Sequence, residues 1–197
     1  MRSHQYALGG YYTGINGWEF SVEGYYKDMR NVLEYKDGVS FFGSSSGWEN
    51  KVEMGKGRSA GIEFMAQKTA GKTTGWLSYT LSKSDRKFTK GGINNGEWFP
   101  YKYDRRHSIN LTINHKFSDR IDIGASWVFY TGGTSTIPEE KTTVIRPHNG
   151  ANNGFLWYGT YDNTNSSPTI GDVSYIEHRN NFRLPASHRL NLGVNFN

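Results

Sequence analysis

The sequence of 197 residues contains no cysteine and only five prolines. Without cysteine the chain has no disulfide framework, no thiol nucleophile and no zinc ribbon. It also lacks any run of about 18 apolar residues, the length that a membrane-spanning helix requires. Met1 is followed by Arg, Ser and His rather than by an apolar signal segment. A helical membrane protein is therefore excluded, and the chain is expected either to be cytoplasmic or to lack its start.

Hydrophobic residues are also scarce, at 35% of the chain against about 45–50% in ordinary soluble domains. A large conventional core is therefore not expected. Aromatic residues, at 15%, are nevertheless too plentiful for a disordered chain, and glycine occurs 24 times. The formal net charge is +5, but the basic residues are scattered among acidic ones rather than gathered in patches. A nucleic-acid partner is therefore not expected.

Apolar residues recur at every second position along most of the chain. The pattern is clearest where Ile109, Leu111 and Ile113 alternate with serine, asparagine and threonine. A period of two is typical of β-strands with one apolar and one polar face, and no segment shows the helical period of 3.6. The pattern predicts seven long strands, at about residues 4–13, 17–35, 57–70, 75–88, 102–117, 121–132 and 183–196.

The expected connections between these strands alternate in length. Three are short and rich in turn-forming residues, namely 14–17, 70–75 and 118–120. Three are long and polar, namely about 36–55, 88–101 and 131–183. An antiparallel up-and-down meander of this kind places all tight turns at one rim and all large loops at the other, as in bacterial outer-membrane barrels.

Strand length favours a membrane barrel over a soluble sandwich. Strands of soluble proteins average about five or six residues, whereas the alternation here continues for about ten or more. Ten residues at about 3.3 Å each, tilted by about 45°, rise roughly 23 Å, close to the apolar band of an outer-membrane barrel. Strands can pair every backbone amide in lipid only by closing into a barrel. The apolar face would then meet lipid tails, and the polar face would line a wet lumen.

Motifs that mimic catalytic or cofactor sites lack the structural context that those sites need. The segment 43–47 matches a nucleophile elbow, but nothing that follows it is helical. The segment 55–60 mimics a dinucleotide fingerprint, which needs a helix N-terminus, whereas the strand period continues through Phe64. The six histidines show no metal-ligand spacing. We therefore expect no enzyme, no cofactor, and no catalytic or metal-binding residue.

Ionisable residues are concentrated at positions 103–107, where Asp104, Arg105 and Arg106 enter an expected strand. Alternate residues of a strand share a face, and acidic and basic side chains can pair across neighbouring strands. Together with Glu63, these three residues are expected to form a charged ladder on the lumen wall. A solvated strand end is the alternative interpretation of the same segment.

The segment Tyr-Asp-Arg-Arg-His at 103–107 resembles a signature in the C-terminal part of TonB-dependent receptors, the plugged transporters of Gram-negative outer membranes. Other segments resemble strands of the same family in the same order, in a style most similar to receptors of the Bacteroidetes. They are Gln5–Gly9, Glu23–Met29, Gly57–Glu63, Trp76–Ser82 and Leu184–Val194. The resemblance spans nearly the whole chain and implies an all-β meander that forms part of a transmembrane β-barrel.

The resemblance also implies a location in the outer membrane and a role in importing a nutrient, such as a siderophore, cobalamin or a glycan. The family joins a signal peptide, a TonB box and a globular plug to a barrel of about 22 strands, whereas seven strands are too few and odd in number. The chain is therefore expected to be an internal piece of such a barrel. Its expected partners are outer-membrane lipid, the plug and remaining strands of the parent chain, TonB through the missing N-terminal region, and a small-molecule or glycan ligand.

Aromatic residues of the long loops are expected to capture the ligand, because flat rings stack on sugars or planar chelates. The expected contacts are Trp98, Phe99, Tyr101, Trp157, Tyr158 and Tyr161; packing within the loops is the alternative role. Two other functions stay open. A small outer-membrane barrel, acting as an adhesin or pore, requires an eighth strand within 131–183 and pairing of the first strand with the last. A soluble carbohydrate-binding β-sandwich requires the apolar faces to meet each other.

Overall fold

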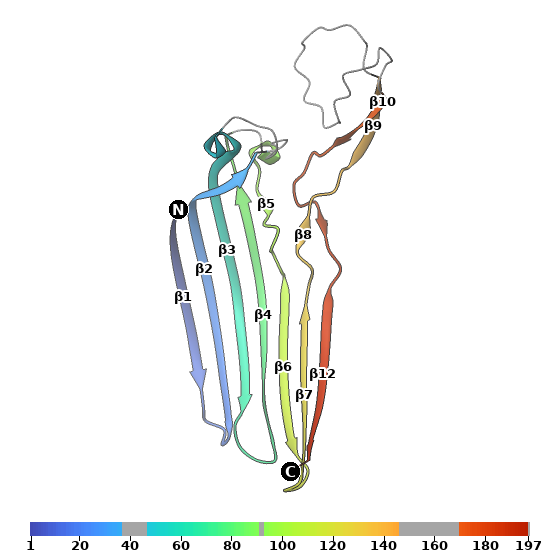
Figure 1. The fold of residues 1–197 in the computed structure, drawn as a ribbon. Coiled ribbons are helices and arrows are strands. Elements are labelled where there is room, and N and C mark those ends of the chain that lie inside the picture. Colours follow the sequence, from blue (N-terminus) through green and yellow to red (C-terminus); the bar gives the residue numbers. More distant parts are fainter. Residues whose placement is uncertain (37–46, 91–92, 146–169, 197) are drawn as a thin grey trace.

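The computed structural model describes residues 1–36, 47–90, 93–145 and 170–196. The described chain consists of antiparallel strands and two short 3₁₀ helices (Figure 1). The long strands are β1 (Arg2–Tyr12), β2 (Trp18–Tyr35), β3 (Val52–Lys68), β4 (Thr73–Lys87), β6 (His107–Lys116), β7 (Ile121–Tyr130) and β12 (Ser187–Phe196). The all-β fold class that the sequence predicts is confirmed.

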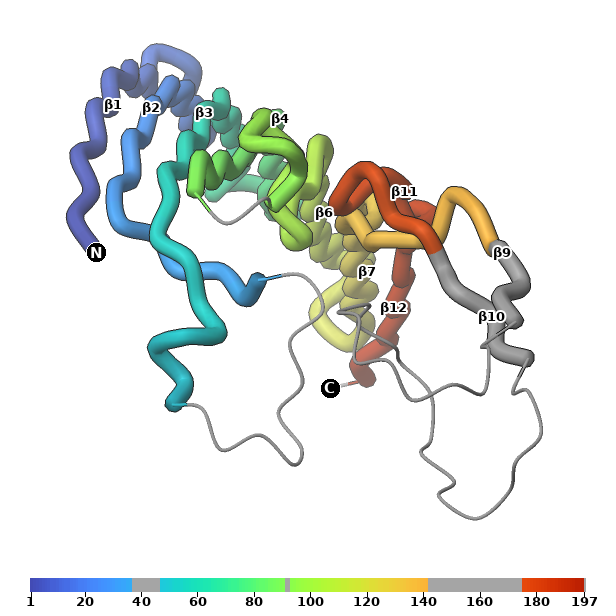
Figure 2. The backbone as a smooth tube through the Cα atoms, turned by 90° about the horizontal axis from the view of Figure 1, so that it is seen from above, coloured from blue at the N-terminus to red at the C-terminus, as the bar shows by residue number. Residues whose placement is uncertain are grey.

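The long strands form one sheet in the order β1-β2-β3-β4-β6-β7-β12, and every neighbouring pair is antiparallel. Seen from above, the strands follow an open arc (Figure 2). β1 and β12 are the two edges of this sheet and do not pair with each other. The described part of the chain is therefore an unclosed meander, which agrees with part of a barrel wall.

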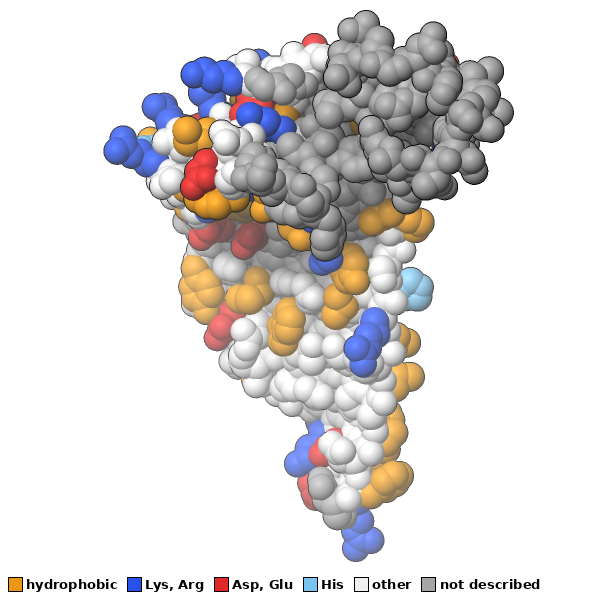
Figure 3. Space-filling view, turned by 45° about the horizontal axis from the view of Figure 1, so that its top comes forward, with side chains coloured by type: hydrophobic (Ala, Val, Ile, Leu, Met, Phe, Trp, Pro, Cys, Tyr) orange, Lys and Arg blue, Asp and Glu red, His pale blue; other side chains and the backbone are white. Residues whose placement is uncertain are grey.

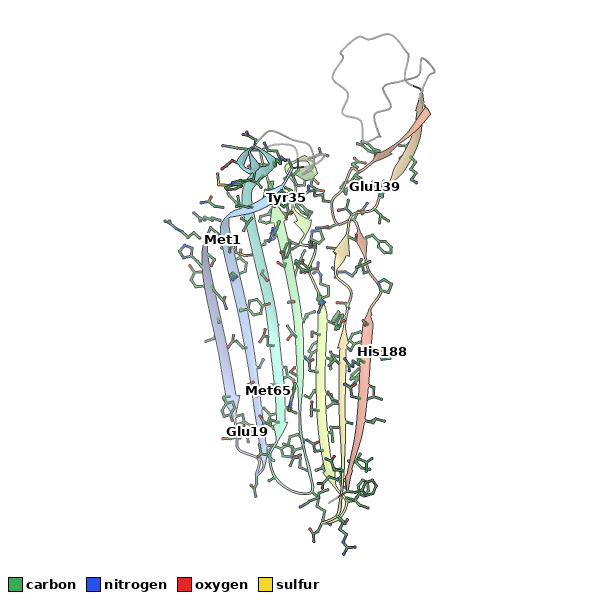
Figure 4. All side chains as sticks on the ribbon, viewed as in Figure 1. Met1, Glu19, Tyr35, Met65, Glu139 and His188 are labelled. Atoms are coloured by element: carbon green, nitrogen blue, oxygen red, sulfur yellow. The ribbon has the colours of Figure 1, made fainter. Side chains whose placement is uncertain are left out.

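The short elements gather at one end of the sheet (Figure 1). They are the 3₁₀ helices η1 (Trp48–Lys51) and η2 (Ile93–Gly96) and the strands β5 (Phe99–Pro100), β8 (Thr134–Ser135), β9 (Glu140–Ile145), β10 (Ile170–Tyr175) and β11 (Phe182–Arg183). Tight connections at 13–17, 69–72 and 117–120 lie at the opposite end. We call these ends the loop end and the turn end. Figure 4 labels Tyr35 and Glu139 toward the loop end and Glu19 toward the turn end.

The structure corrects several boundaries predicted from the sequence. β3 begins at Val52 rather than at about 57, because the ladder with β2 continues as far as the pair Tyr35 and Val52. β6 begins at His107 rather than at about 102, because residues 101–106 turn away from the ladder to make other contacts. The expected long loops also contain η1, η2 and the short strands. The sequence predicted none of these elements. η1, η2, β5, β8 and β11 are too short for a periodic pattern, and β9 and β10, with six residues each, do not alternate apolar and polar residues.

The register aligns apolar residues of neighbouring strands into rows on one face of the sheet, which we call the apolar face. One row consists of Phe20, Ala66, Leu77, Leu111, Trp127 and Leu190. Residues at the intervening positions form the polar face, which is rich in serine, threonine, asparagine and glycine. In Figure 3 hydrophobic side chains follow the right-hand edge of the molecule, whereas the lower middle shows mostly side chains that are neither hydrophobic nor charged.

Every long strand except β7 has exposed side chains on the apolar face, and those of β7 are half-buried. Leu8 is 85% exposed and Leu192 is 72% exposed. Among the described residues no second sheet packs on this face, so the β-sandwich interpretation is wrong, because it requires these side chains to be buried between two layers. The described residues also do not form the small closed barrel that was the other alternative. β8, β9, β10 and β11 do not join the large sheet, and its two edges do not pair.

Candidate functional site

A β-bulge in β2 brings the loop end over the polar face. Asn31 has a φ of 56°, and the pairing with β3 shifts between Arg30 and Val32. Asparagine adopts this left-handed conformation more readily than most residues. The extra residue turns Val32 to the polar face, where it is 2% exposed. There it joins a buried cluster with Phe88, Ile93 and Phe99.

This cluster fixes the connection between β4 and β6 at the loop end. The rings of Phe88 and Phe99 lie 6.0 Å apart between centroids, and Met29 packs against the cluster. Gly55 lies under the ring of Phe88, where any Cβ would collide with that ring. Because η2 and β5 each contribute a buried side chain, the cluster holds both elements against the sheet.

A buried carboxylate, Asp104, joins three segments of the loop end. It is 1% exposed. The backbone N–H of Ser84 donates to Asp104 Oδ1 at 2.7 Å, and both Arg106 Nε and Arg183 Nη2 donate to Oδ2, at 2.9 and 2.6 Å. Arg183 Nη1 also donates to the backbone carbonyls of Asp104 and Gly132. The carboxylate thus ties β4, the start of β6 and β11 together.

A second ion-pair cluster lies around Glu34. Arg86 Nη1 donates to Glu34 Oε2 at 2.9 Å, and Arg179 Nη1 lies 3.7 Å from Oε1. The guanidinium carbon of Arg86 lies 3.7 Å from the ring centroid of Tyr101. The backbone N–H of Arg179 donates to the side chain of Asn94. Segments far apart in the sequence are therefore held together by charge over the polar face.

Within the described ranges, Glu53 is a buried side chain without a hydrogen-bond partner. It pairs in register with Glu34 on the neighbouring strand and is 6% exposed. Among the described residues, neither of its carboxylate oxygens accepts a hydrogen bond. A buried carboxylate without partners is costly. An ammonium group, a guanidinium group or a metal cation that reached this point would find an acceptor.

The structure separates the three described aromatic residues that the sequence predicts as ligand contacts. Trp98 is 37% exposed and stacks on Arg58, whose guanidinium carbon lies 4.3 Å from the ring centroid. Arg58 belongs to the apolar face by register, so Trp98 lies on that side. Phe99 is 3% exposed and cannot offer a ring face, which corrects the prediction for this residue. Tyr101 is half-buried and lies against Arg86.

Two further aromatic side chains neighbour this region. Tyr103 is 64% exposed, and its ring meets that of Tyr101 edge-on with 5.3 Å between centroids. The Lys102 ammonium lies 4.9 Å from the Tyr103 ring centroid. The other expected ligand contacts, Trp157, Tyr158 and Tyr161, lie outside the described residues. Tyr103 is thus an exposed aromatic group at the loop end that the sequence reasoning did not select.

The four residues of the expected charge ladder do not form one ladder. Asp104 and Arg106 form an ion pair. Arg105 lies over the ring of Tyr130 instead, with its guanidinium carbon 4.1 Å from the centroid. Glu63 lies opposite Glu23 on β2, on the polar face and nearer the turn end than Asp104. The reason is that the chain turns before His107, so Asp104 and Arg105 do not alternate along a strand.

One described cluster has the composition of a metal site. The ligand atoms of Glu139, Glu177 and His178 lie within 4.8 Å of one another, and all three residues are exposed. A hydrogen bond from Asn181 is the main cause that lowers the pKa of Glu139 below its ordinary value, and a bond from the His178 backbone acts in the same direction. Both bonds tie the base of the β9–β10 ribbon together, so they already assign this carboxylate a structural role.

The partners that the sequence reasoning missed are Glu34, Arg86, Arg179 and Arg183. They contact one another or Asp104 only after residues far apart in the chain have been brought together. No local spacing signals such a contact. The bulge at Asn31 had a weak local signal, because asparagine favours positive φ.

The comparisons with known proteins agree with this architecture. The model of the family described as "TonB dependent receptor-like, beta-barrel" matches residues 1–197. The chain therefore belongs to the TonB-dependent receptor β-barrel family, whose members are outer-membrane transport receptors of Gram-negative bacteria rather than enzymes. The searches of curated proteins and of solved structures found no match. No helix in the described residues is long and apolar enough to cross a membrane.

Proposed function

We propose that this chain forms wall and extracellular loops of a TonB-dependent receptor that imports a siderophore, cobalamin or a glycan. The proposal rests on the antiparallel meander of long strands, found in a chain that belongs to this family. Its apolar face carries exposed side chains on every long strand except β7, where they are half-buried, and the strand ends that flank the long connections lie at one end. Such strands bury their apolar side chains in lipid and turn their polar side chains to the lumen.

The loop end is then the mouth on the extracellular side, where long loops of outer-membrane barrels lie. Arg105, Tyr101 and Tyr103 offer a guanidinium group and two ring faces there, and the expected loop contacts Trp157, Tyr158 and Tyr161 would add to them. Trp98 would anchor the apolar face at the membrane interface rather than touch the ligand, which its contact with Arg58 supports.

The polar face would form the lumen wall. Its serine, threonine and asparagine side chains are neutral hydrogen-bonding groups that suit a wet surface or the plug of the parent receptor. Glu63 would contribute charge to this wall, whereas Asp104 and Arg106 would hold the loop end against it through their ion pair. TonB would act through the N-terminal region of the receptor, and the Bacteroidetes-like style of the sequence stays a prediction.

Uptake by cells tests the proposal. Cells carrying the receptor are given a radiolabelled ferric siderophore, cyanocobalamin or an oligosaccharide, and accumulation is compared with that in strains lacking the receptor or TonB. We expect one of the three to accumulate at least about tenfold above both controls, because binding at the mouth and energised import act in series. Equal accumulation of all three compounds in the receptor-bearing and receptor-less strains would contradict the proposal, as would uptake that does not depend on TonB.

A further inference from the structure

Four basic residues lie in one row across four neighbouring strands of the apolar face. The register pairs Arg2 with Arg30, Arg30 with Lys56, and Lys56 with Lys87. Arg30 precedes the bulge, so it shares the face of Val22 and Tyr26. We call Arg2, Arg30, Lys56 and Lys87 the basic row. Met1, beside the first of these residues, lies at the loop end of β1 in Figure 4.

The basic row has more positive charge than its neighbours neutralise. Like charges directly opposite each other in adjacent strands destabilise a sheet. The next row toward the turn end contains two carboxylates, of which Asp28 neutralises one member of the basic row, Arg30, and Asp85 is engaged outside the basic row. Asp28 lies 3.2 Å from Arg30, and Asp85 lies 3.0 Å from Arg58 and 3.5 Å from Lys83. Among the described residues, no carboxylate pairs with Arg2, Lys56 or Lys87, so an external anion would relieve this repulsion.

The basic row is open to the surroundings of the sheet. The side chain of Arg30 is 65% exposed, Arg2 and Lys56 are exposed as well, and Lys87 is half-buried. Lys83, two same-face positions nearer the turn end than Lys87 on β4, has a side chain that is 53% exposed. Figure 3 shows Lys and Arg side chains gathered at the upper left, on the side where β1 lies in Figure 1.

In the outer membrane the basic row would lie at the level of the lipid headgroups. Tyr6 and Tyr26, which are opposite each other in register, lie below it, and below them lie Leu8 and Ile62, which are 85% and 55% exposed. The step from Tyr26 to Arg30 rises about 10 Å on a strand tilted by about 40°. Exposed tyrosines mark the edge of the hydrocarbon region, so the basic row lies where headgroup phosphates are concentrated. Trp98, stacked on Arg58, adds another ring at this level.

We infer that the basic row binds the phosphate groups of anionic lipid in the outer leaflet. Guanidinium and ammonium groups are the usual partners of phosphate, and near a membrane surface each contributes to attraction. The inference rests on the proposed function only for the placement of the apolar face in the outer membrane. It requires neither ligand uptake nor TonB.

Binding of a phosphorylated lipid tests the inference. The receptor in a neutral detergent is titrated with mixed micelles of that detergent and phosphatidylcholine that contain bisphosphorylated lipid A. In the test variant the basic row carries Arg2→Gln, Arg30→Gln, Lys56→Gln and Lys87→Gln. The matched control carries Lys68→Gln, Lys72→Gln, Lys116→Gln and Arg120→Gln, which remove equal charge toward the turn end. We expect the test variant to lose at least about tenfold in affinity and the control to lose less than about twofold.

Three further measurements make the test specific. A variant with Arg2→Lys, Arg30→Lys, Lys56→Arg and Lys87→Arg, which keeps the charge, should retain binding and shows that affinity follows charge rather than the particular side chains. Dephosphorylated lipid A should bind weakly to the unaltered receptor. Inorganic phosphate at the same concentration should not compete. Equal affinity in the glutamine variant, equal affinity for the dephosphorylated lipid, or full competition by inorganic phosphate would overturn the inference.

Discussion

At the scale of single residues, charge that is buried at the loop end does most to define the local structure. Asp104 is 1% exposed and receives hydrogen bonds from three groups on separate segments. Because a buried charge is costly unless it is paired, these contacts specify one arrangement of the segments. Arg106 is two residues from Asp104, so the sequence already placed the two side chains close together. Arg183 is far away in the sequence and reaches Asp104 only in the folded chain.

The substitution Asp104→Ala should therefore destabilise the loop end. It leaves two guanidinium groups without their carboxylate, and we expect a loss of about 2–3 kcal/mol, at the low end for a buried pair because both arginines are 31% exposed. Urea unfolding of the receptor in detergent measures the loss. The control is Asp28→Ala, whose exposed pair with Arg30 should contribute less than about 1 kcal/mol. Similar losses in both variants would show that burial of Asp104 is unimportant.

At the scale of elements, close contact between strand backbones depends on glycine at particular positions. Gly75 lies in β4 opposite Ile113 of β6 with a φ of 158°. A Cβ at this position would collide with the backbone carbonyl oxygen of Thr112. A backbone atom in a paired strand cannot move aside without disturbing the ladder, so this position constrains the β4–β6 pairing.

We expect Gly75→Ala to weaken that pairing by about 1–3 kcal/mol, the usual range for a group forced into an occupied space. Hydrogen exchange of the β4 and β6 amides should increase, and the unfolding midpoint should fall. Gly10→Ala is the matched change, because a Cβ at Gly10 of β1 meets no atom within 4 Å. If Gly10→Ala proved as damaging as Gly75→Ala, backbone contact would not be the cause.

At the scale of the whole molecule, the two faces of one sheet require different surroundings. The row through Leu111 runs from β2 to β12 and contains only apolar residues. Asn110, the preceding residue of β6, belongs to the polar face and donates to Ser78. An isolated sheet in water would leave the whole apolar face exposed, which soluble proteins rarely do. In a barrel wall, lipid would cover the apolar face and the water-filled lumen would solvate the polar face.

Leu111→Arg should consequently prevent stable insertion, whereas Asn110→Arg should be tolerated. We expect a cost of about 2–4 kcal/mol for a guanidinium group near the middle of the bilayer and a small effect on the lumen side. Folding into phosphatidylcholine vesicles, followed by the heat-dependent shift of the compact band in gel electrophoresis, compares the two variants. Equal folding of both would mean that this face does not contact lipid.

The sequence by itself determined the strands and their faces. Alternation in Ile109, Leu111 and Ile113 fixes which side chains share a face, because the pleat repeats every two residues. Turn-forming residues at short connections fix antiparallel pairing between consecutive strands, and the order of short and long connections fixes which end bears the loops. These features depend on neighbours in the chain, so a sequence without coordinates is enough to predict them.

The tertiary structure alone decided which distant residues meet at the loop end and along each row. The ion pair of Asp104 with Arg183 and the packing of Phe99 into a buried cluster depend on positions that no local period records. The basic row depends on register, since residues far apart in sequence become neighbours only when the hydrogen-bond ladder aligns them. Pairing between strands is set by the energy of the whole sheet, and a shift of one residue would have moved every one of these side chains to the opposite face.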